Sequence, residues 1–434
     1  MDEASLIAQF EHSVADRPPT PQLVPESMRI GRRIRLRRRL AAAATSALVV
    51  ALIAAIVPVA YGALSRPAPA ARGHRIPETV YSASSNGLVT PIRVATNAAR
   101  RGVRIARMVN LGTPLAVAPD GRVVYAASAF GEITPINLAT NTASRAIRVT
   151  SSPLGTILVT PDGRTAYVLA AGGAVIPVNL ARDRPGKLIR TAADQIVMTP
   201  DGKTVYAFNN YSRSVLPIRT ATGTALKSIS VGVRPYTTQD IAVSPDDATV
   251  YVLSGSPSRN GGQITPISTA TNTPEQPINL TGGVMDIAIS PSGGIAYVTD
   301  CTGPDRYVLL PVDLANRKVL TPISLPAHFW DVSSVAFSPD GSMAYIAIGS
   351  KGTQRGTELV PIRTATNTGL APVHLPISRP ILIGVSPDSS TVYVSGELLS
   401  DWTKFAVFPV RTGATSPRRP VVVPEAPVAM VFAP

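Results

Sequence analysis

A unit of 40 to 50 residues recurs along most of this chain, and it limits the folds that the chain can adopt. Its clearest copy reads LAVAPDGRVVYAA over residues 115–127 and ITPINLATNT over residues 133–142. A Pro-Ile or Pro-Val pair marks every copy, at Pro91, Pro135, Pro177, Pro217, Pro266, Pro311, Pro361 and Pro409. A period in this range, written as short alternating strands between tight turns, is typical of an all-β fold of the β-propeller type.

Four strand types make up each unit. The first precedes a Pro-Asp-Gly turn, the second carries a Tyr-Val pair, the third contains the proline pair, and the fourth is a short apolar piece, as at residues 146–149 or 228–231. The chain opens with a second-type strand at 79–83 and closes with a first-type strand at 428–432, so its two ends together complete one blade. Each type occurs eight times, which favours eight four-stranded antiparallel blades; seven is the alternative if a terminal blade is degenerate.

The proline in the third strand conflicts with a rule of β-sheets. Proline has no N–H to donate to a ladder, so it is normally confined to edge strands or bulges. The third strand is an interior strand of each predicted sheet. Eight prolines there predict either a bulge or an imino nitrogen that faces a gap where the fourth strand is short, and the sequence leaves both open.

The composition suits small-residue strands and frequent turns. Aromatic residues make up 5% of the chain and charged residues 16%. The single Cys301 excludes an internal disulfide and a structural zinc site built from several cysteines. The formal net charge is +14, which would suit nucleic acid, but a solvated basic surface that keeps the domain soluble is the interpretation we favour.

An uncharged apolar segment separates the repeats from a basic leader. Residues 40–64 are rich in Ala, Val, Leu and Ile, and no charged side chain lies between Arg39 and Arg66. At about 1.5 Å per residue, such a segment can cross a hydrocarbon core of about 30 Å. The arginine cluster just before it predicts a cytoplasmic N-terminus, because basic flanks stay inside. We therefore expect one transmembrane α-helix in contact with the lipid bilayer, and a propeller outside the cell membrane, where nucleic acid is not a partner.

The resulting division is a cytoplasmic leader at 1–39, the transmembrane helix at 40–64, a Pro/Ala-rich linker at 65–78 and the propeller at 79–434. A cleaved signal peptide is the competing interpretation, since Ala60 and Gly62 form a small-residue pair that a peptidase could use. The leader is much longer than a usual signal-peptide n-region, which favours an uncleaved anchor.

The repeat resembles that of the YVTN-family β-propellers, relatives of the WD40 propellers. The segments SPDG at 338–341, AYVT at 296–299 and ATNT at 270–273 carry the resemblance, which covers about residues 78–434. The chain departs from the family in having Pro-Ile or Pro-Val where the family usually has Ile-Asp. The resemblance implies a surface-exposed or secreted propeller that binds rather than catalyses. Lactonase propellers are similar in outline, so a hydrolase is the alternative.

Alternating strand direction divides the turns between two faces of the predicted disc. The Pro-Asp-Gly and Ala-Thr-Asn-Thr turns share one face and hardly vary, so we expect this tight-turn face to be structural. The other connections share the opposite, variable face, where loops at 254–263, 299–307, 349–358 and 396–404 are long and polar. The chain enters its first strand at the tight-turn face, so the variable face should point away from the membrane.

Binding residues on a rigid scaffold usually lie in its variable loops. The variable face offers basic and aromatic side chains, and carboxylates at the mouth of the central channel. The candidate ligand-binding residues are Arg234, Tyr236, Asp240, Asp286, Arg306, His328, Trp330, Asp331, Arg355 and Trp402. Such a rim would suit an anionic cell-envelope polymer, a glycan or a protein ligand. Loop packing with solvated charge is the alternative.

Residues that would mark an enzyme are sparse. The four histidines are too dispersed for a zinc site, and neither a Gly-x-Ser-x-Gly elbow nor a phosphate-binding glycine loop is present. We predict no catalytic residue, no metal and no cofactor. Asp240 and Asp286 begin first-type strands of neighbouring blades and could bind a cation, but hydrogen bonds to nearby backbone N–H groups are the simpler interpretation. The sequence thus predicts a binding or scaffolding module at the bacterial cell surface, with a lactonase-like hydrolase using these carboxylates as the alternative.

Overall fold

The computed structural model describes residues 79–108, 112–231, 237–256, 259–303, 306–326, 329–350, 356–423 and 425–433. The predicted leader, transmembrane helix and linker at 1–39, 40–64 and 65–78 lie outside these residues. Among the residues described, no helix has the length and apolarity needed to cross a bilayer.

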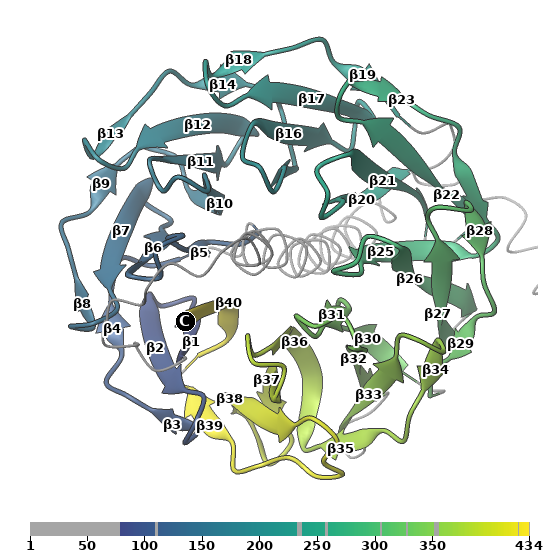
Figure 1. The fold of residues 1–434 in the computed structure, drawn as a ribbon. Helices are drawn as coiled ribbons and strands as arrows, with labels where there is room; N and C mark the ends of the chain where they lie inside the picture. Colours follow the sequence, from purple (N-terminus) through teal and green to yellow (C-terminus); the bar gives the residue numbers. More distant parts are fainter. Residues whose placement is uncertain are drawn as a thin grey trace, which may run out of the picture. The chain divides into compact units, whose positions relative to one another are not determined.

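Eight antiparallel sheets form a ring (Figure 1). We number them as blades in chain order. Blade 1 contains β1 (Thr79–Ser84), β2 (Leu88–Arg93), β3 (Ala98–Ala99), β4 (Val103–Arg104) and β40 (Pro427–Ala433). Blade 2 contains β5 (Leu115–Val117), β6 (Val123–Ala127), β7 (Glu132–Asn137), β8 (Thr142–Ala143) and β9 (Ile147–Arg148). Blade 3 contains β10 (Leu154–Val159), β11 (Thr165–Ala170), β12 (Ala174–Asn179), β13 (Arg184–Pro185) and β14 (Ile189–Arg190). Blade 4 contains β15 (Gln195–Met198), β16 (Thr204–Asn209), β17 (Ser214–Arg219), β18 (Thr224–Ala225) and β19 (Ile229–Ser230).

The second half of the ring has longer strands. Blade 5 contains β20 (Thr237–Val243), β21 (Thr249–Ser256), β22 (Arg259–Ser268), β23 (Thr273–Pro274) and β24 (Ile278–Leu280). Blade 6 contains β25 (Gly283–Ile289), β26 (Ile295–Gly303), β27 (Arg306–Asp313), β28 (Lys318–Val319) and β29 (Ile323–Ser324). Blade 7 contains β30 (Phe329–Val332), β31 (Ala336–Phe337), β32 (Met343–Ser350), β33 (Thr357–Arg363), β34 (Thr368–Gly369) and β35 (Val373–Leu375). Blade 8 contains β36 (Ile377–Val385), β37 (Thr391–Leu398), β38 (Asp401–Arg411) and β39 (Val421–Val423).

The first and last strands of the ring pair with each other. β40 lies antiparallel to β1, with Ala433 opposite Thr79 and Met430 opposite Ser82. In Figure 1 the purple β1 and the yellow β40 stand side by side in blade 1. The predicted shared blade and the predicted count of eight are both confirmed, and every sheet is antiparallel as expected.

The third-strand prolines face a break in the outer strand. In blade 2, β7 pairs with β8 through Ile136 and with β9 through Ile133, and no paired residue lies between them. The carbonyl of Pro135, between these two positions, accepts a hydrogen bond of 2.8 Å from the N–H of Ser144. The N and C=O of one strand residue point the same way, so the imino nitrogen faces the break.

All eight prolines accept the same carbonyl bond from the outer segment. Of the two explanations, the gap is therefore correct and the bulge is wrong. The predicted fourth strand also needs a correction. In blades 1 to 7 it begins directly after the turn and consists of two short pieces, because proline offers no donor between them.

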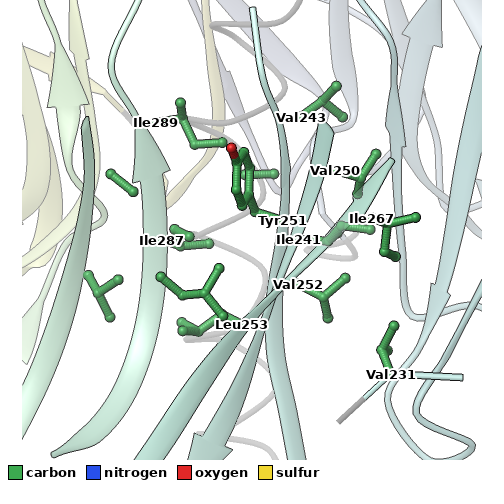
Figure 2. Close-up of a cluster of buried hydrophobic side chains, with 14 of the residues drawn as sticks. Val231, Ile241, Val243, Val250, Tyr251, Val252, Leu253, Ile267, Ile287 and Ile289 are labelled. Atoms are coloured by element: carbon green, nitrogen blue, oxygen red, sulfur yellow. The ribbon is translucent and has the colours of Figure 1, made fainter. Parts of the chain in front are cut away.

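Neighbouring blades pack face to face through apolar side chains. Figure 2 shows this at the centre of the largest buried cluster, where Leu253 of β21 lies beside Ile287 of β25, and Val252 lies toward Val231 of blade 4. All four side chains are at least 98% buried. Fully burying such a side chain is worth about 1.5–3 kcal/mol, so every blade depends on both of its neighbours.

The two repeated motifs meet across blade boundaries. The hydroxyl of Tyr206 in blade 4 donates to Asn272 Oδ1 in the turn of blade 5, at 2.8 Å. Tyr297 bonds Asn367 in the same way, at 2.7 Å, and Tyr393 of blade 8 bonds Asn97 of blade 1, at 3.0 Å. The asparagines have positive φ, which this residue tolerates better than most. The tight-turn face is therefore held together by the side chains of the repeat itself.

Candidate functional site

Asp240 and Asp286 lie on the innermost strands of neighbouring blades 5 and 6. Each strand is irregular just before its aspartate, with register shifts between Thr238 and Asp240 and between Val284 and Asp286. A bulge of this kind frees a backbone N–H from the ladder. Asp240 Oδ2 accepts a hydrogen bond from the backbone N–H of Ile287, at 3.2 Å. Its Oδ1 accepts one from the backbone N–H of Ile241, at 2.9 Å.

The two carboxyl groups are both buried, and the charge of Asp286 acts on Asp240. Asp240 exposes none of its surface and Asp286 exposes 5%. Burial raises the pKa of Asp240 well above its ordinary value, and the charge of Asp286 raises it further. Burial and a neighbouring carboxyl group both disfavour the charged form of Asp240, so the site favours the protonated form.

Asp240 takes the place of a backbone acceptor. In blade 3 the N–H of Ile157, which occupies the position of Ile287, donates to the carbonyl of Thr113 in blade 2, at 3.0 Å. In blade 6 the carboxyl of Asp240 accepts the equivalent bond. Hydrogen bonding to nearby N–H groups, which the sequence suggested as the simpler interpretation, is thus what Asp240 does, and it joins two blades.

Sequence reasoning missed a further buried carboxyl group, that of Asp300 in β26, which is 2% exposed. Burial raises its pKa, and the N–H of Gly283 opposes that rise by donating to it. A Cβ on Gly282 would lie 1.8 Å from its Oδ2, so only glycine leaves room for the carboxylate. The Asp-Cys pair at 300–301 was expected in a loop, and a glycine pair at the start of the neighbouring strand β25 was the only signal available.

The described residues do not assemble a metal centre. No group of three or more His, Cys, Asp or Glu side chains among them could hold a metal ion. Among the described residues, buried side-chain oxygens without a hydrogen-bond partner do occur, on Gln195 of blade 4, Ser254 of blade 5 and Thr299 of blade 6. Thr299 lies directly opposite Asp286.

The variable face differs from the expected set of loops. The segments at 254–263, 299–307 and 396–404 are largely continuations of strands, with Gly255 opposite Gly262, Cys301 opposite Tyr307 and Glu397 opposite Phe405. In blade 7, β32 and β33 likewise run on to Ser350 and from Thr357. Blades 5 to 8 therefore raise long hairpins on this face, whereas β6–β7, β11–β12 and β16–β17 in blades 2 to 4 end in short turns.

The candidate rim residues fall on or beside these hairpins where they are described. The backbones of Arg306 in β27, Trp330 and Asp331 in β30, and Trp402 in β38 are in strands. Gly303 pairs with Arg306 at the tip of its hairpin, and Trp402 follows Asp401, which pairs with Leu398 at another tip. The remaining candidates, Arg234, Tyr236, His328 and Arg355, lie outside the described residues.

Two exposed aromatic side chains on this face were not predicted. Phe130 lies in the turn between β6 and β7 and is 57% exposed, and Tyr211 lies in the turn between β16 and β17 and is 86% exposed. Both belong to the half of the ring with short turns. An aromatic residue among the Gly, Ser and Asn residues of a tight turn is the signal that could have found them.

These features define an eight-bladed β-propeller, and solved structures agree. Dihydro-heme d1 dehydrogenase NirN in complex with DHE has a TM-score of 0.65 and 16% identity, over 83% of this chain and 77% of that one. Hydrazine synthase of Kuenenia stuttgartiensis has a TM-score of 0.53 and 19% identity, over 69% of this chain and 95% of that one. No family model matches the chain, and no curated protein matches it in sequence. The likeness concerns the fold alone.

Proposed function

We propose that this protein is a YVTN-like propeller anchored by one transmembrane helix in the bacterial cell membrane, with its propeller outside the cell. The apolar segment at 40–64 and the arginine cluster before it support the anchor and its direction. β1 begins at Thr79 on the tight-turn face, opposite Ala433. A tether there leaves the variable face directed away from the bilayer.

The propeller acts as a binding or scaffolding module. The observation that carries this proposal is the set of long hairpins that blades 5 to 8 raise on the variable face, with Arg306 and Trp402 beside two of their tips. Hairpins on a closed ring hold the backbone of such residues in place, which lowers the ordering cost of binding. An anionic envelope polymer or glycan fits a basic, aromatic rim.

The carboxyl pair supports a structural role better than a hydrolytic one. The two solved structures named above are those of enzymes, but their likeness to this chain extends to the fold only. Asp240 is fully buried and uses both oxygens on backbone N–H groups of two blades. A substrate would have to separate the blades to reach it.

A binding experiment tests the proposal. The full chain, reconstituted in nanodiscs, is titrated with soluble peptidoglycan fragments and with polyphosphate as an anionic polymer. Trp402→Ala should weaken binding of one probe about tenfold or more, as truncation of an interface aromatic commonly does. Tyr211→Ala removes an exposed aromatic from the same face in the other half of the ring and is the matched control, with affinity retained.

The same preparation separates the two function classes. Asp240→Asn should leave probe affinity unchanged, because the hairpin tips are intact. Release of acid from simple γ- and δ-lactones is measured in parallel. Turnover that Asp240→Asn abolishes, or affinity that Trp402→Ala and Tyr211→Ala reduce equally, would contradict a rim-based binding module.

A further inference from the structure

The charge of the ring is concentrated in its first half. Residues 79–231 hold 17 Lys and Arg against 6 Asp and Glu, whereas residues 232–434 hold 13 against 15. A basic surface that only keeps a protein soluble has no reason to favour four of eight equivalent blades. The difference therefore points to a partner on that side.

The charge follows a position in the repeat. The residue directly after the positive-φ residue of the first turn is exposed and basic in blades 2 to 4, where it is Arg122, Arg164 and Lys203. The equivalent residues of blades 5 to 8 are small and neutral: Ala248, Gly294, Ser342 and Ser390. This position lies on the tight-turn face in blades 2 to 8.

The turns and outer edge of blades 1 to 4 together form what we call the basic turn surface. Its basic side chains are Arg93, Arg100, Arg101, Arg122, Arg145, Arg164, Arg182, Arg184, Lys187, Lys203, Arg219 and Lys227, and its acidic ones are Asp120, Asp162, Asp183 and Asp201. All but Arg93 among the basic residues are exposed. Three of the acidic side chains already accept hydrogen bonds from backbone N–H groups of their own turns: Asp120, Asp162 and Asp201.

The same surface of blades 5 to 8 is neutral. It carries as many acidic as basic side chains: Asp246, Asp247, Glu275, Asp313, Asp340 and Asp388 against Arg317, Lys318, Arg363, Arg411, Arg418 and Arg419. Arg317 and Glu275 form an ion pair there. Both halves of the ring are built from the same repeat in the same chain. The general Arg content of the chain therefore does not explain why only one half is basic.

We propose that the basic turn surface rests on the anionic phosphate headgroups of the membrane that anchors the chain. This inference rests on the proposed anchor. β1 begins on the tight-turn face, and the linker at 65–78 spans at most about 50 Å when fully extended, so the bilayer is within reach. Exposed charges act over about 8 Å at physiological salt, and arginine pairs with phosphate through two parallel hydrogen bonds.

The consequence is a tilted ring. Blades 1 to 4 lie against the lipid, and the neutral surface of blades 5 to 8 lies further from it. On the opposite face, the long hairpins of blades 5 to 8 then stand furthest from the membrane. One charge gradient around the ring would orient the proposed binding rim outward.

The test uses the full chain with Cys301→Ser, reconstituted in nanodiscs of neutral lipid or of neutral lipid with 30% phosphatidylglycerol. Ala181→Cys in blade 3 and Ala315→Cys in blade 6 occupy the same turn position after a leucine, and both positions are exposed. Alkylation at Ala181→Cys should slow about fivefold or more in the anionic nanodiscs, and high salt should restore it. Alkylation at Ala315→Cys should be the same in both lipids.

Charge removal supplies the second arm. The combination Arg182→Gln, Arg184→Gln and Lys187→Gln should abolish the slowing at Ala181→Cys, whereas Arg363→Gln, Arg411→Gln and Arg418→Gln should not. Equal alkylation of the two sites in both lipids would overturn the proposal. Equal protection by soluble polyphosphate in neutral nanodiscs would also overturn it, because the surface would then accept any polyanion.

Flotation with vesicles at high salt reports separately on the anchor. A chain that floats at high salt but shows no lipid-dependent protection is anchored and lacks the docking contact, which defeats this inference alone. A chain that leaves the vesicles at high salt, yet is protected at low salt only in anionic lipid, keeps the docking contact and defeats the anchor.

Discussion

The carboxyl group of Asp240 joins two blades in a way that depends on a proton. It accepts an N–H bond from Ile287 of the next blade, while the charge of the buried Asp286 carboxyl group raises its pKa. In water both acids would be ionised at neutral pH, and two adjacent buried carboxylates would repel each other. The contact between blades 5 and 6 is therefore a place where pH acts on the described part of the ring.

Asp240→Asn should remove a pH dependence of stability. The pKa of Asp240 in the folded protein lies well above the ordinary 3.8. Its favourable contribution to the free energy of unfolding is therefore fully present below pH 3.8 and is lost as the pH rises through the folded pKa. Asparagine stays neutral, still accepts the Ile287 N–H and can donate to Asp286. Urea unfolding of the full chain in detergent should show the variant gaining relative to the unsubstituted protein between pH 4.5 and 8, by at most about 1.4 kcal/mol per pH unit.

A surface aspartate whose pKa is shifted in the opposite direction is the control. Hydrogen bonds from Thr403 and Lys404 lower the pKa of Asp401 to about 2. Asp401→Asn should therefore bring no relative gain at pH 8. Parallel stability curves for Asp240→Asn and the unsubstituted protein over this range would show that the pKa of Asp240 is not raised in the folded protein.

The repeat placed Asp240 and Asp286 in neighbouring blades correctly, because a fixed period aligns equivalent positions. It could not show that both are buried between the blades, or that Asp300 joins them in the interior. Those facts depend on register shifts before Asp240 and Asp286. A one-residue shift changes which side of a strand a side chain faces, and no local pattern announces it.

Strand pairing explains why one proline per blade is tolerated. In β7 the carbonyl of Glu132 accepts a bond from Ser128, and the N–H of Leu138 donates to Arg122, so alternate residues of the third strand face the second strand. Pro135 lies between these alternate positions, so its nitrogen and carbonyl face the broken outer strand. The period of two along the strand fixes this outcome for every blade.

Moving the proline by one residue should therefore be costly. Thr134→Pro places the missing donor against β6, where Thr134 lies opposite Ala126, and should destabilise by about 3 kcal/mol or more. Pro135→Ala restores an N–H that faces the break and should cost about 1 kcal/mol or less, through the unfolded chain. Urea unfolding of both variants measures the difference. Equal costs would show that the proline does not face the outer strand.

The sequence predicted the alternation of the four strand types well and the long hairpins badly. The segment SGSPSRNGG at 254–262 is rich in Gly, Ser and Pro, which indicates a loop. Its ends nevertheless pair, with Ser254 opposite Gln263 and Ser256 opposite Arg259. The underlying blade already holds the two strands at ladder distance, so pairing continues beyond the residues that would favour it alone.

The ring as a whole has two unlike halves built on one repeat. Blades 1 to 4 carry the basic turn surface, and blades 5 to 8 carry the long hairpins and the carboxyl pair. Closure could be predicted because the chain starts and ends in complementary parts of one blade. The charge difference could not be interpreted from the net charge of +14, since its meaning appears only when each basic residue is assigned to a face and a blade.

Closure through β1 and β40 is the claim on which all other positions depend, and a disulfide tests it most directly. Ser82 and Met430 are opposite each other, 348 residues apart, in a pair whose Cα atoms should lie about 4.5 Å apart. Ser82→Cys with Met430→Cys, in a Cys301→Ser background, should form an intramolecular disulfide in the folded monomer, whereas Ser82→Cys with Val428→Cys should not. Crosslinks only between molecules, or none in the first pair, would contradict a ring closed by its own two ends.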